Sequence, residues 1–326
     1  MSQNAIVLIS RNTKDYEFAQ EVSKSLGIRF TQTETVARLH EVLCENLGTF
    51  ILWDYDSVLE ERPVDAKLNR DLIHYFEKHR AWNRVFAISS KPLRDSIIPG
   101  NFALFSKYIY RSFNPQTIPV YCHIIQNVLV PDPFEPHSVG ANKVAVQKTT
   151  ITNFARKKAT IEALSIILEK KSLPKRVASS VIQALDELIM NAVFDAPIDD
   201  KKKHFKQGLD RGTEFELKKE EQVDIDLMIT DAFLQVSVTD YFGSLDREDF
   251  IPLLAKNFQK QGVSQSGAAP RSDRGLGLYQ ILNSGLSMQV LIEPGKRTRM
   301  SLIIPWVANV RELKDSFRFF CLRTKT

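Results

Sequence analysis

The sequence predicts two domains of different class: an α/β doubly wound parallel sheet, followed by an α+β sandwich. Three observations predict this arrangement. The chain has 326 residues, which is enough for two hydrophobic cores. In residues 1–129 short apolar runs alternate with helix-length segments, as in a parallel sheet covered by helices. Beyond residue 148 the order changes to two long helices followed by paired strands.

In the first domain, residues 1–129, the apolar runs predict five strands, at residues 5–9, 28–31, 49–53, 85–88 and 108–110. The intervening polar-apolar segments predict four helices, at residues 15–26, 33–46, 68–79 and 115–129. Residues 130–148 are the predicted linker, because residues 130–143 contain three prolines and little apolar periodicity.

The second domain, residues 149–326, begins with two predicted helices, at residues 149–171 and 175–194, which Leu173-Pro174 separates. Its predicted strands cover residues 224–229, 234–239, 288–293 and 299–304, and the last two form a hairpin through Pro294-Gly295. One further helix is expected near residue 280. For the tail, residues 311–326, we expect a helix packed back on the domain, with a partner-binding helix as the alternative.

Composition excludes several classes of protein. No apolar run approaches the roughly 20 residues of a membrane span, and the first residues lack the features of a secretory signal. The net charge of +5 is modest, and the lysines at 201–203 lie beside acidic residues, so we expect a solvated loop and no nucleic-acid partner. Cys44, Cys122 and Cys321 are scattered and odd in number, which is typical of reduced thiols in the cytoplasm.

Four motifs follow one another in the second domain. The first is DELIMNA on the second helix, in which Glu187 and Asn191 are one turn apart. A strand then ends at Asp240 before Gly243, and the segment RGLGLYQI opens the later helix. The last motif is GKRTRMSLIIP, which contains Thr298.

In this order the motifs resemble the N-box, the two glycine boxes and the terminal threonine motif of the GHKL ATPase superfamily, over residues 149–305. That superfamily includes gyrase, heat-shock chaperones and histidine kinases. The resemblance implies that ATP or ADP binds with Mg²⁺. The implied nucleotide-binding residues are Asn191, Asp240, Gly243, Gly275, Leu276, Gly277 and Thr298.

Each implied role has a physical reason. The amide oxygen of Asn191 is a hard ligand of the kind that Mg²⁺ prefers. Asp240 can accept a hydrogen bond from an adenine amino group, with Thr298 supporting it directly or through water. Glycines such as Gly275 and Gly277 let the backbone approach phosphates at a helix start.

The chain departs from the family pattern at three places. Tyr241 and Phe242 follow Asp240 and bring an aromatic side chain where a small residue normally approaches the base. Phe194 and Asp195 stand where relatives often have a cation. The insertion at residues 195–223 is long and charged, and residues 244–272 correspond to the ATP lid.

Within the superfamily, the nearest branch is that of anti-sigma-factor serine kinases. Residues 149–171 contain no histidine, which argues against a histidine kinase, and too little chain follows residue 305 for a topoisomerase or chaperone. In the serine-kinase branch the residue equivalent to Glu187 is the catalytic base for a partner's serine. A sigma factor, an anti-anti-sigma-like protein or another signalling protein is then the implied partner.

The first domain resembles a two-component receiver. Asp54 ends the third predicted strand, where receivers carry the phosphoacceptor, and RSFNP at residues 111–115 resembles their lysine-proline turn with arginine instead of lysine. The acidic pair after the first strand is replaced by Ser10-Arg11-Asn12, which disfavours metal binding. We expect a degenerate receiver that serves as a docking surface; an unrelated flavodoxin-like domain is the alternative.

These features predict a cytosolic, bacterial-type signalling protein whose GHKL module regulates a protein partner. Nucleotide-dependent partner binding and serine or threonine phosphorylation both remain open as mechanisms. The rival hypotheses are a non-catalytic scaffold with a vestigial nucleotide pocket and an orphan kinase that feeds an external receiver. The sequence does not predict the oligomeric state.

Overall fold

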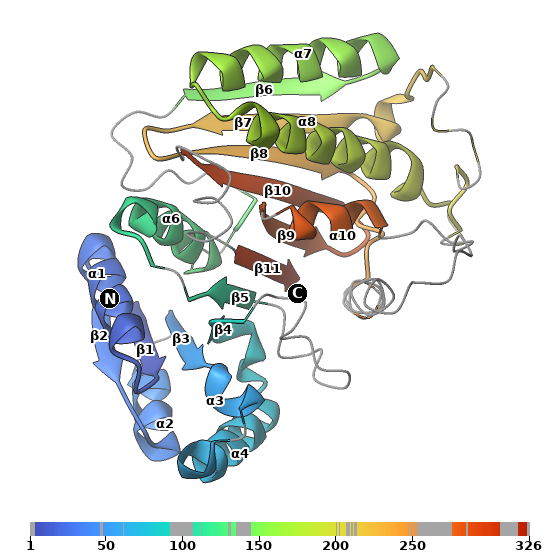
Figure 1. The fold of residues 1–326 in the computed structure, drawn as a ribbon. Helices are drawn as coiled ribbons and strands as arrows, with labels where there is room; N and C mark the ends of the chain where they lie inside the picture. Colours follow the sequence, from blue (N-terminus) through green and yellow to red (C-terminus); the bar gives the residue numbers. More distant parts are fainter. Residues whose placement is uncertain are drawn as a thin grey trace, which may run out of the picture. The chain divides into compact units, whose positions relative to one another are not determined.

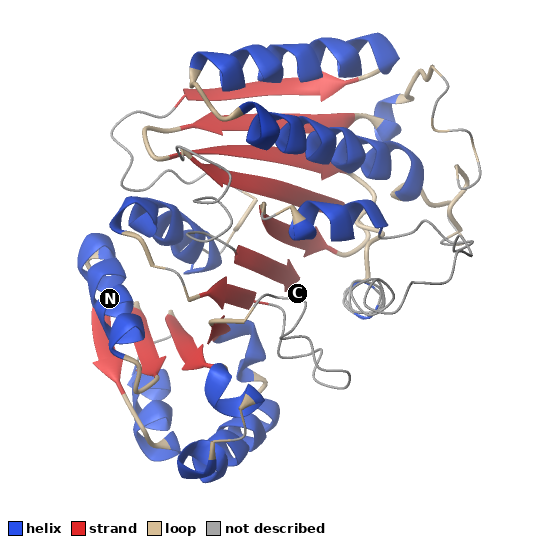
Figure 2. Cartoon of the chain, viewed as in Figure 1, coloured by secondary structure: helices blue, strands red, loops and turns tan. Residues whose placement is uncertain are grey.

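The computed structural model describes residues 4–45, 48–60, 62–91, 107–111, 113–129, 132–134, 145–199, 201, 203–206, 209, 211, 214–246, 248, 250, 252, 276–284, 286–306 and 319–324. The fold is of mixed α/β class (Figure 2). The chain divides into two compact units, Met1–Ala141 and Asn142–Thr326.

The described part of the first unit contains a parallel sheet in the order β2-β1-β3-β4-β5. Its strands are β1 (Ala5–Ile9), β2 (Arg29–Gln32), β3 (Thr49–Asp54), β4 (Val85–Ser89) and β5 (Lys107–Tyr110). All five predicted strands are confirmed, with bounds that differ by at most one residue at either end.

Helices connect these strands: α1 (Thr13–Leu26), α2 (Val36–Glu45), α3 (Asp56–Leu59), α4 (Pro63–Lys78) and α6 (Ile118–Leu129), with short 3₁₀ turns at Ala81–Arg84 and Pro115–Thr117. Alternate residues of β1, β3 and β4 pack against α2 and α4 in one hydrophobic cluster centred on Trp53 and Phe76. Ile6 and Leu8, which point to the opposite face, are also fully buried. Both faces of the central strands are therefore covered, as expected for a parallel sheet.

The second unit has a sheet in the order β11-β9-β10-β8-β7-β6. Its strands are β6 (Ala145–Ile151), β7 (Val223–Ile229), β8 (Phe233–Asp240), β9 (Ser287–Glu293), β10 (Arg297–Pro305) and β11 (Phe319–Thr324). Neighbouring strands are antiparallel except β11, which runs parallel to β9.

Three helices, α7 (Phe154–Lys170), α8 (Lys175–Met190) and α10 (Leu276–Asn283), lie on one face of this sheet (Figure 1). Two short helical turns follow, at Asn191–Asp195 and Lys219–Glu221. The helices described in this unit are thus layered on a mostly antiparallel sheet. The stretch Lys175–Asp195 is long and apolar enough to cross a membrane, but it includes the core helix α8 and is weak evidence for a span.

Strand β6 corrects the predicted boundary between linker and second domain. Residues up to 148 were expected in a linker and residues from 149 in a helix, but Ala145–Ile151 is a strand and α7 begins at Phe154. The strand lies at the edge of the sheet, and its first four residues are exposed, so it has no apolar run to identify it. Of the linker itself, residues 130–131 and 135–144 lie outside the described residues.

Strand β11 corrects the prediction for the tail. A helix was expected over residues 311–326, but Phe319–Thr324 pairs with β9 and buries Cys321 and Leu322. Aromatic residues such as Phe319 and Phe320 favour a strand at least as strongly as a helix. Residues 311–318 lie outside the described part of the chain.

Candidate functional site

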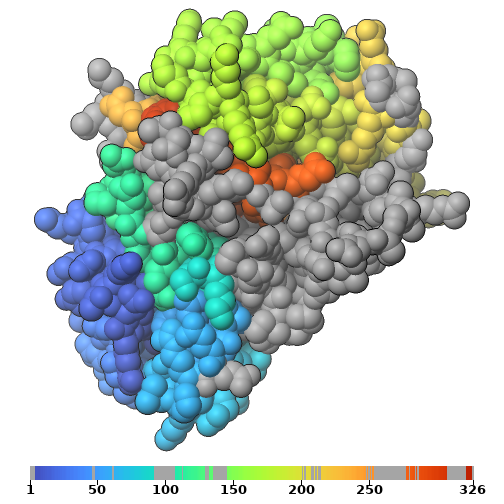
Figure 3. All heavy atoms as spheres, viewed as in Figure 1, coloured from blue at the N-terminus to red at the C-terminus, as the bar shows by residue number. Residues whose placement is uncertain are grey.

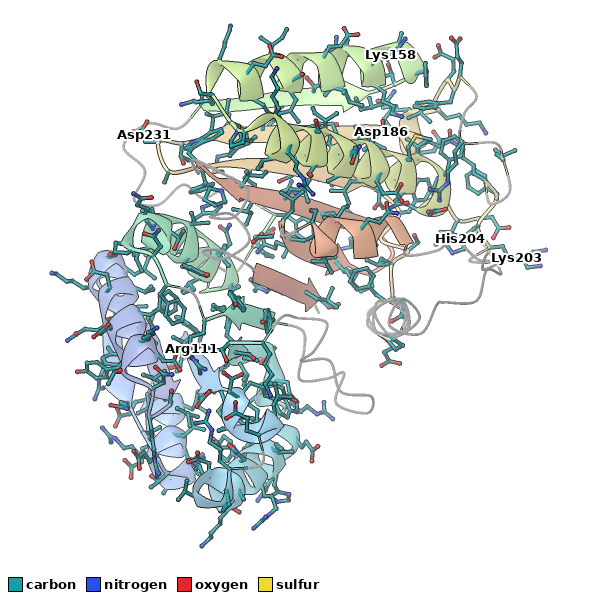
Figure 4. The ribbon with its side chains drawn as sticks, viewed as in Figure 1. Arg111, Lys158, Asp186, Lys203, His204 and Asp231 are labelled. Carbon is teal, nitrogen blue, oxygen red and sulfur yellow. The ribbon has the colours of Figure 1, made fainter. Side chains whose placement is uncertain are left out.

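Helix α8 presents the first motif on two different faces. Its apolar side, which includes Val181, Leu185 and Leu188, is buried against the sheet. Asp186 points toward α7 and forms an ion pair of 2.7 Å with Lys157 (Figure 4). Glu187 and Asn191 lie on another side, one turn apart.

The helix widens immediately after Met190. Residues Asn191–Asp195 form a π turn, in which the Ala196 amide donates to the Asn191 carbonyl oxygen five residues earlier, at 2.9 Å. Such turns are rare and occur frequently at functional sites. Here the turn ends α8 beside a pocket.

The pocket has a volume of about 190 Å³. It is lined by Leu188, Asn191, Ala192, Asp195, Ala196, His204, Val238, Asp240, Ser244, Leu245, Asp246, Phe250, Leu278, Thr298 and Met300. These residues come from α8 and the π turn, from the insertion, from β8 and β10, from the segment after β8 and from α10. Three residues predicted from separate motifs, Asn191, Asp240 and Thr298, therefore lie around one cavity.

Asp240 is the last residue of β8 and lies opposite Thr298 on β10. Its Oδ1 atom accepts hydrogen bonds from the amides of Phe242, at 3.0 Å, and Gly243, at 3.2 Å. Burial raises the pKa of Asp240 to about 6, although these amides and Thr298 partly oppose the rise. An ionised carboxylate has about four lone-pair sites, so Asp240 keeps capacity to accept a hydrogen bond from a ligand.

Thr298 supports the same position. It is 2% exposed, and among the described residues its Oγ1 atom has no hydrogen-bond partner of good geometry. Its nearness to Asp240 nevertheless lowers the pKa of that carboxyl. A buried hydroxyl without a firm partner is a favourable place for a ligand or a water to bind.

The expected aromatic obstruction beside Asp240 is not found. Tyr241 is 49% exposed, and its hydroxyl donates to Asp224 at 2.5 Å. Neither Tyr241 nor Phe242 lines the pocket. The two aromatic residues thus stand outside this pocket, because β8 ends in a turn that directs Tyr241 toward Asp224 on β7.

Gly243 allows the backbone after β8 to approach the backbone of the β9–β10 turn closely. Its φ of 56° is in the left-handed region, and a Cβ atom there would lie 2.3 Å from the Glu293 carbonyl oxygen. The Gly295 amide donates to the Gly243 carbonyl oxygen at 3.0 Å. Gly243 thus attaches the end of β8 to the β9–β10 turn and does not itself line the pocket.

Gly277 brings the second glycine motif against the first motif. A Cβ atom at this position would lie 2.0 Å from the Glu187 Oε1 atom, so a larger residue would require the Glu187 side chain to move. In Figure 3 the orange-red atoms of the α10 region lie directly beside the yellow-green atoms of α8. Leu276 is the first residue of α10, and Gly275 lies outside the described residues.

The Glu187 carboxylate does not line the pocket but lies next to it, with 32% of its side chain exposed. Burial raises the pKa of Glu187, and the charge of Arg211 and a hydrogen bond with Asn191 partly offset this effect. The residue predicted as a catalytic base is therefore held beside a cation.

Arg211 is the functional candidate that the motifs did not reveal. Its guanidinium lies 2.5 Å from Asp195 Oδ2, 3.5 Å from Asn191 Oδ1 and 3.8 Å from Glu187 Oε1. His204 is a second such residue: it lines the pocket, and among the described residues its Nδ1 atom is buried without a hydrogen-bond partner. Both belong to the insertion at residues 195–223, whose length and charge were the only signals in the sequence.

These contacts do not fit a magnesium ion held at Asn191. The amide oxygen that the resemblance assigns to the metal faces the Arg211 guanidinium, which also pairs with the neighbouring carboxylates. Within the described part of the chain, no group of three or more His, Cys, Asp or Glu side chains could hold a metal ion. The Arg211 guanidinium lies among the acidic side chains around Asn191.

In the first unit, Arg111 joins the carboxyl ends of several strands. It follows β5 and pairs with Asp15 on α1 at 2.8 Å, with Asp54 at the end of β3 at 2.5 Å, and with Asp56 on α3. All four side chains are at most 6% exposed. Pairing with Asp15 and Asp54 raises the pKa of Arg111 despite its burial, so the guanidinium stays charged.

The acids in this cluster differ in their surroundings. Burial raises the pKa of Asp54, although Arg111 partly opposes the rise. Burial alone would also raise the pKa of Asp56, but hydrogen bonds from Ser89 and Ser90 and the charge of Arg111 lower it below its usual value. Asp54, the predicted phosphoacceptor, is thus paired with a buried cation.

Arg11, which the sequence placed at the acidic pair of receivers, takes a different position. It pairs with Glu34 at 3.0 Å and with Asp65 at 3.8 Å, and half of its side chain is exposed. The cation that contacts Asp54 and Asp15 is Arg111. Arg11 therefore does not face Asp54, whereas Arg111, which stands for the lysine of the receiver motif, does.

Compared with known proteins, the sequence matches no protein-family model, and a search of curated proteins finds no match either. The resemblance to the GHKL superfamily therefore stays a prediction, which depends on the four motifs and on the geometry described above.

Proposed function

We propose that the second unit binds the adenine base of ATP or ADP in the pocket between α8, β8, β10 and α10, in the manner of GHKL proteins. The chain would then be a cytosolic, bacterial-type signalling protein in which nucleotide binding regulates a protein partner. A sigma factor or an anti-anti-sigma-like protein is the partner class that the serine-kinase branch implies.

One observation carries this proposal: Asn191, Asp240 and Thr298, which belong to motifs far apart in the sequence, line a single cavity. At its buried end Asp240 carries a carboxylate, the acceptor that an exocyclic amino group requires. Apolar side chains such as Leu188, Val238 and Met300 supply surfaces for a flat heterocycle.

The size of the cavity supports a base as the occupant. A volume of about 190 Å³ is below the roughly 300–1,000 Å³ of pockets that enclose drug-sized ligands. A purine ring fits this scale better than a whole nucleoside triphosphate. The phosphates would lie outside the cavity, on the side of the π turn and the insertion.

The decisive experiment is calorimetric titration of the full chain with ADP and with adenosine. We expect Asp240→Asn to weaken the binding of both ligands by about 10- to 100-fold, because losing a buried acceptor costs ~1–3 kcal/mol. Asp231→Asn is the matched control, since Asp231 is exposed at the opposite end of the sheet from His204 (Figure 4). Absence of adenosine and ADP binding to the wild-type chain at millimolar ligand would disprove the proposal.

Nucleotide-dependent partner binding is the mechanism that we favour over phosphorylation. The supporting observation is that Arg211 pairs with Glu187, so the candidate base is engaged by a cation and is not free toward a substrate hydroxyl. A non-catalytic scaffold with a vestigial pocket is the rival, and nucleotide binding itself separates the two.

For the first unit we propose a degenerate receiver that serves as a docking surface. The strand order β2-β1-β3-β4-β5 is that of flavodoxin-like folds, to which receivers belong. The contact of Arg111 with Asp54 supports a degenerate receiver over a working one, because the residue at the phosphoacceptor position is paired with a buried guanidinium.

A further inference from the structure

The region around Asn191 contains three oxygen-bearing side chains that share one cation. Glu187, Asn191 and Asp195 follow one another at four-residue steps along α8 and its π turn. The Arg211 guanidinium contacts an oxygen of each, at distances between 2.5 and 3.8 Å. Arg211 belongs to the insertion, so ion pairs connect this residue of the insertion to the end of α8.

Because the charge around the pocket is negative, the contact of Arg211 with these side chains matters for the binding of a phosphorylated ligand. The described lining residues include Asp195, Asp240 and Asp246 but neither Lys nor Arg. A diphosphate or triphosphate that approached these carboxylates would be repelled unless a cation lay between them. In many nucleotide sites a divalent ion has this role, but here Arg211 already faces the oxygen atoms that would bind the ion.

An arginine is chemically suited to replace the metal. Its guanidinium remains charged at all ordinary pH values and offers five N–H donors, which can bind phosphate oxygens in pairs. The side chain of Arg211 is 42% exposed, so it can reach an incoming ligand while still paired with Asp195. It therefore has both the charge and the access that a phosphate-binding group needs.

We propose that Arg211 is the phosphate-binding cation among the described residues of this nucleotide site, so that the chain binds the phosphates of ADP or ATP without a divalent metal. This inference rests on the proposed binding of the adenine base in the adjacent pocket. It adds that Arg211 of the insertion is part of the binding site and that Asn191 positions the guanidinium rather than Mg²⁺.

The test is calorimetric titration of the full-length chain with ADP and with adenosine, each in excess EDTA and in excess Mg²⁺. We expect the wild type to bind ADP with similar affinity in both buffers. Arg211→Gln should weaken ADP binding in EDTA by ~10- to 100-fold, as expected for the loss of a charged hydrogen-bond donor, and leave adenosine binding unchanged. Mg²⁺ should restore part of the ADP affinity of this variant, because the freed oxygens can then bind the ion.

Lys203→Gln is the matched control, since it removes one positive charge from the same insertion at an exposed position (Figure 4). It should behave as the wild type. Arg211→Lys, which keeps the charge but not the forked geometry, should lie between wild type and Arg211→Gln.

Three results would overturn the inference. Wild-type ADP binding that requires Mg²⁺, or equal ADP affinities of wild type and Arg211→Gln in EDTA, would show that Arg211 is not the cation of the site; in both cases adenosine binding would leave the proposed base pocket intact. Failure of adenosine and ADP alike to bind the wild type would remove the proposed function together with this inference.

Discussion

Asp240 and Asp54 are buried carboxylates whose surroundings differ at the level of single residues. Backbone amides and the Thr298 hydroxyl surround Asp240, which has no cation among the groups that shift its pKa most. Asp54 instead contacts the Arg111 guanidinium and, more weakly, Arg62. A carboxylate that is desolvated but unpaired can recognise a ligand, whereas one that is paired with a buried cation serves the structure.

The raised pKa of Asp240 predicts a pH dependence of ligand binding. Burial brings its pKa to about 6, so the free protein takes up a proton at this carboxyl as the pH falls below about 6. An amino group binds the ionised form better, and protonation therefore competes with adenosine. We expect adenosine affinity to fall between about pH 7 and pH 5, as measured by calorimetry.

Asp240→Asn supplies the control for this prediction. It cannot titrate, so its weaker adenosine binding should not change over the same range. A wild-type affinity that is constant, or that rises on acidification, would contradict the assignment of Asp240 as the acceptor.

At Asp54 we predict that small-molecule phosphodonors do not modify the protein, with or without Mg²⁺. The physical reason is the Arg111 guanidinium, which contacts Asp15, Asp54 and Asp56 together and leaves no oxygen cluster for a metal. Intact-mass measurement after incubation with acetyl phosphate is the check. A gain of one phosphoryl group that is lost in Asp54→Ala would identify a working receiver.

At the scale of elements, α8 presents adjacent acidic residues to two different helices. Asp186 pairs with Lys157 of α7, whereas Glu187, the next residue, packs against Gly277 of α10. Adjacent acids on one helix thus contact different elements, because successive residues are about 100° apart around the axis. This pair offers a matched comparison for any test of catalysis.

If the chain transfers phosphate, Glu187→Gln should bind ATP as the wild type does and turn it over ~10²- to 10⁴-fold more slowly, because a general base is lost. Asp186→Asn should retain the wild-type rate, and Asn191→Ala should be affected first in nucleotide affinity. The measurement is ATP turnover by the four proteins side by side. Equal rates in all of them would exclude the kinase mechanism, and a wild type that binds ATP without turnover would favour a nucleotide-gated binding module.

Elements with buried, apolar sequences could be predicted, whereas two strands of the second unit, β6 and β11, could not. The central strands β1, β3 and β4 are buried along their whole length and appear as apolar runs. The edge strand β6 is largely exposed, and its polar residues gave no such signal. In β11 the apolar residues are compatible with both helix and strand, and only pairing with β9 decides between them.

For the whole molecule, the order of the motifs predicted which motif residues would lie close together. It did not predict which residues outside the motifs would contact them. Asn191, Asp240 and Thr298 lie around one pocket because a strand end, its antiparallel partner and a helix end meet there. Arg211 and Arg111 reach their sites across 16 or more residues of sequence, through contacts that no local pattern encodes. The resemblance to receivers singled out Arg111 by its motif, whereas no motif indicated Arg211, whose pairing the sequence could not specify.

The Arg111 cluster also has a consequence for folding fidelity. Asp54 ends β3, Asp56 begins α3 directly after it, and Asp15 lies on α1; these carboxylates meet the guanidinium that follows β5 only when β3 and β5 are aligned as they are here. A slip of β3 by one residue would turn Asp54 to the opposite face and leave a buried charge without a partner, at a cost of about 3–5 kcal/mol. The cluster thus adds an electrostatic penalty for misaligned strands to the one that the surrounding hydrophobic side chains impose.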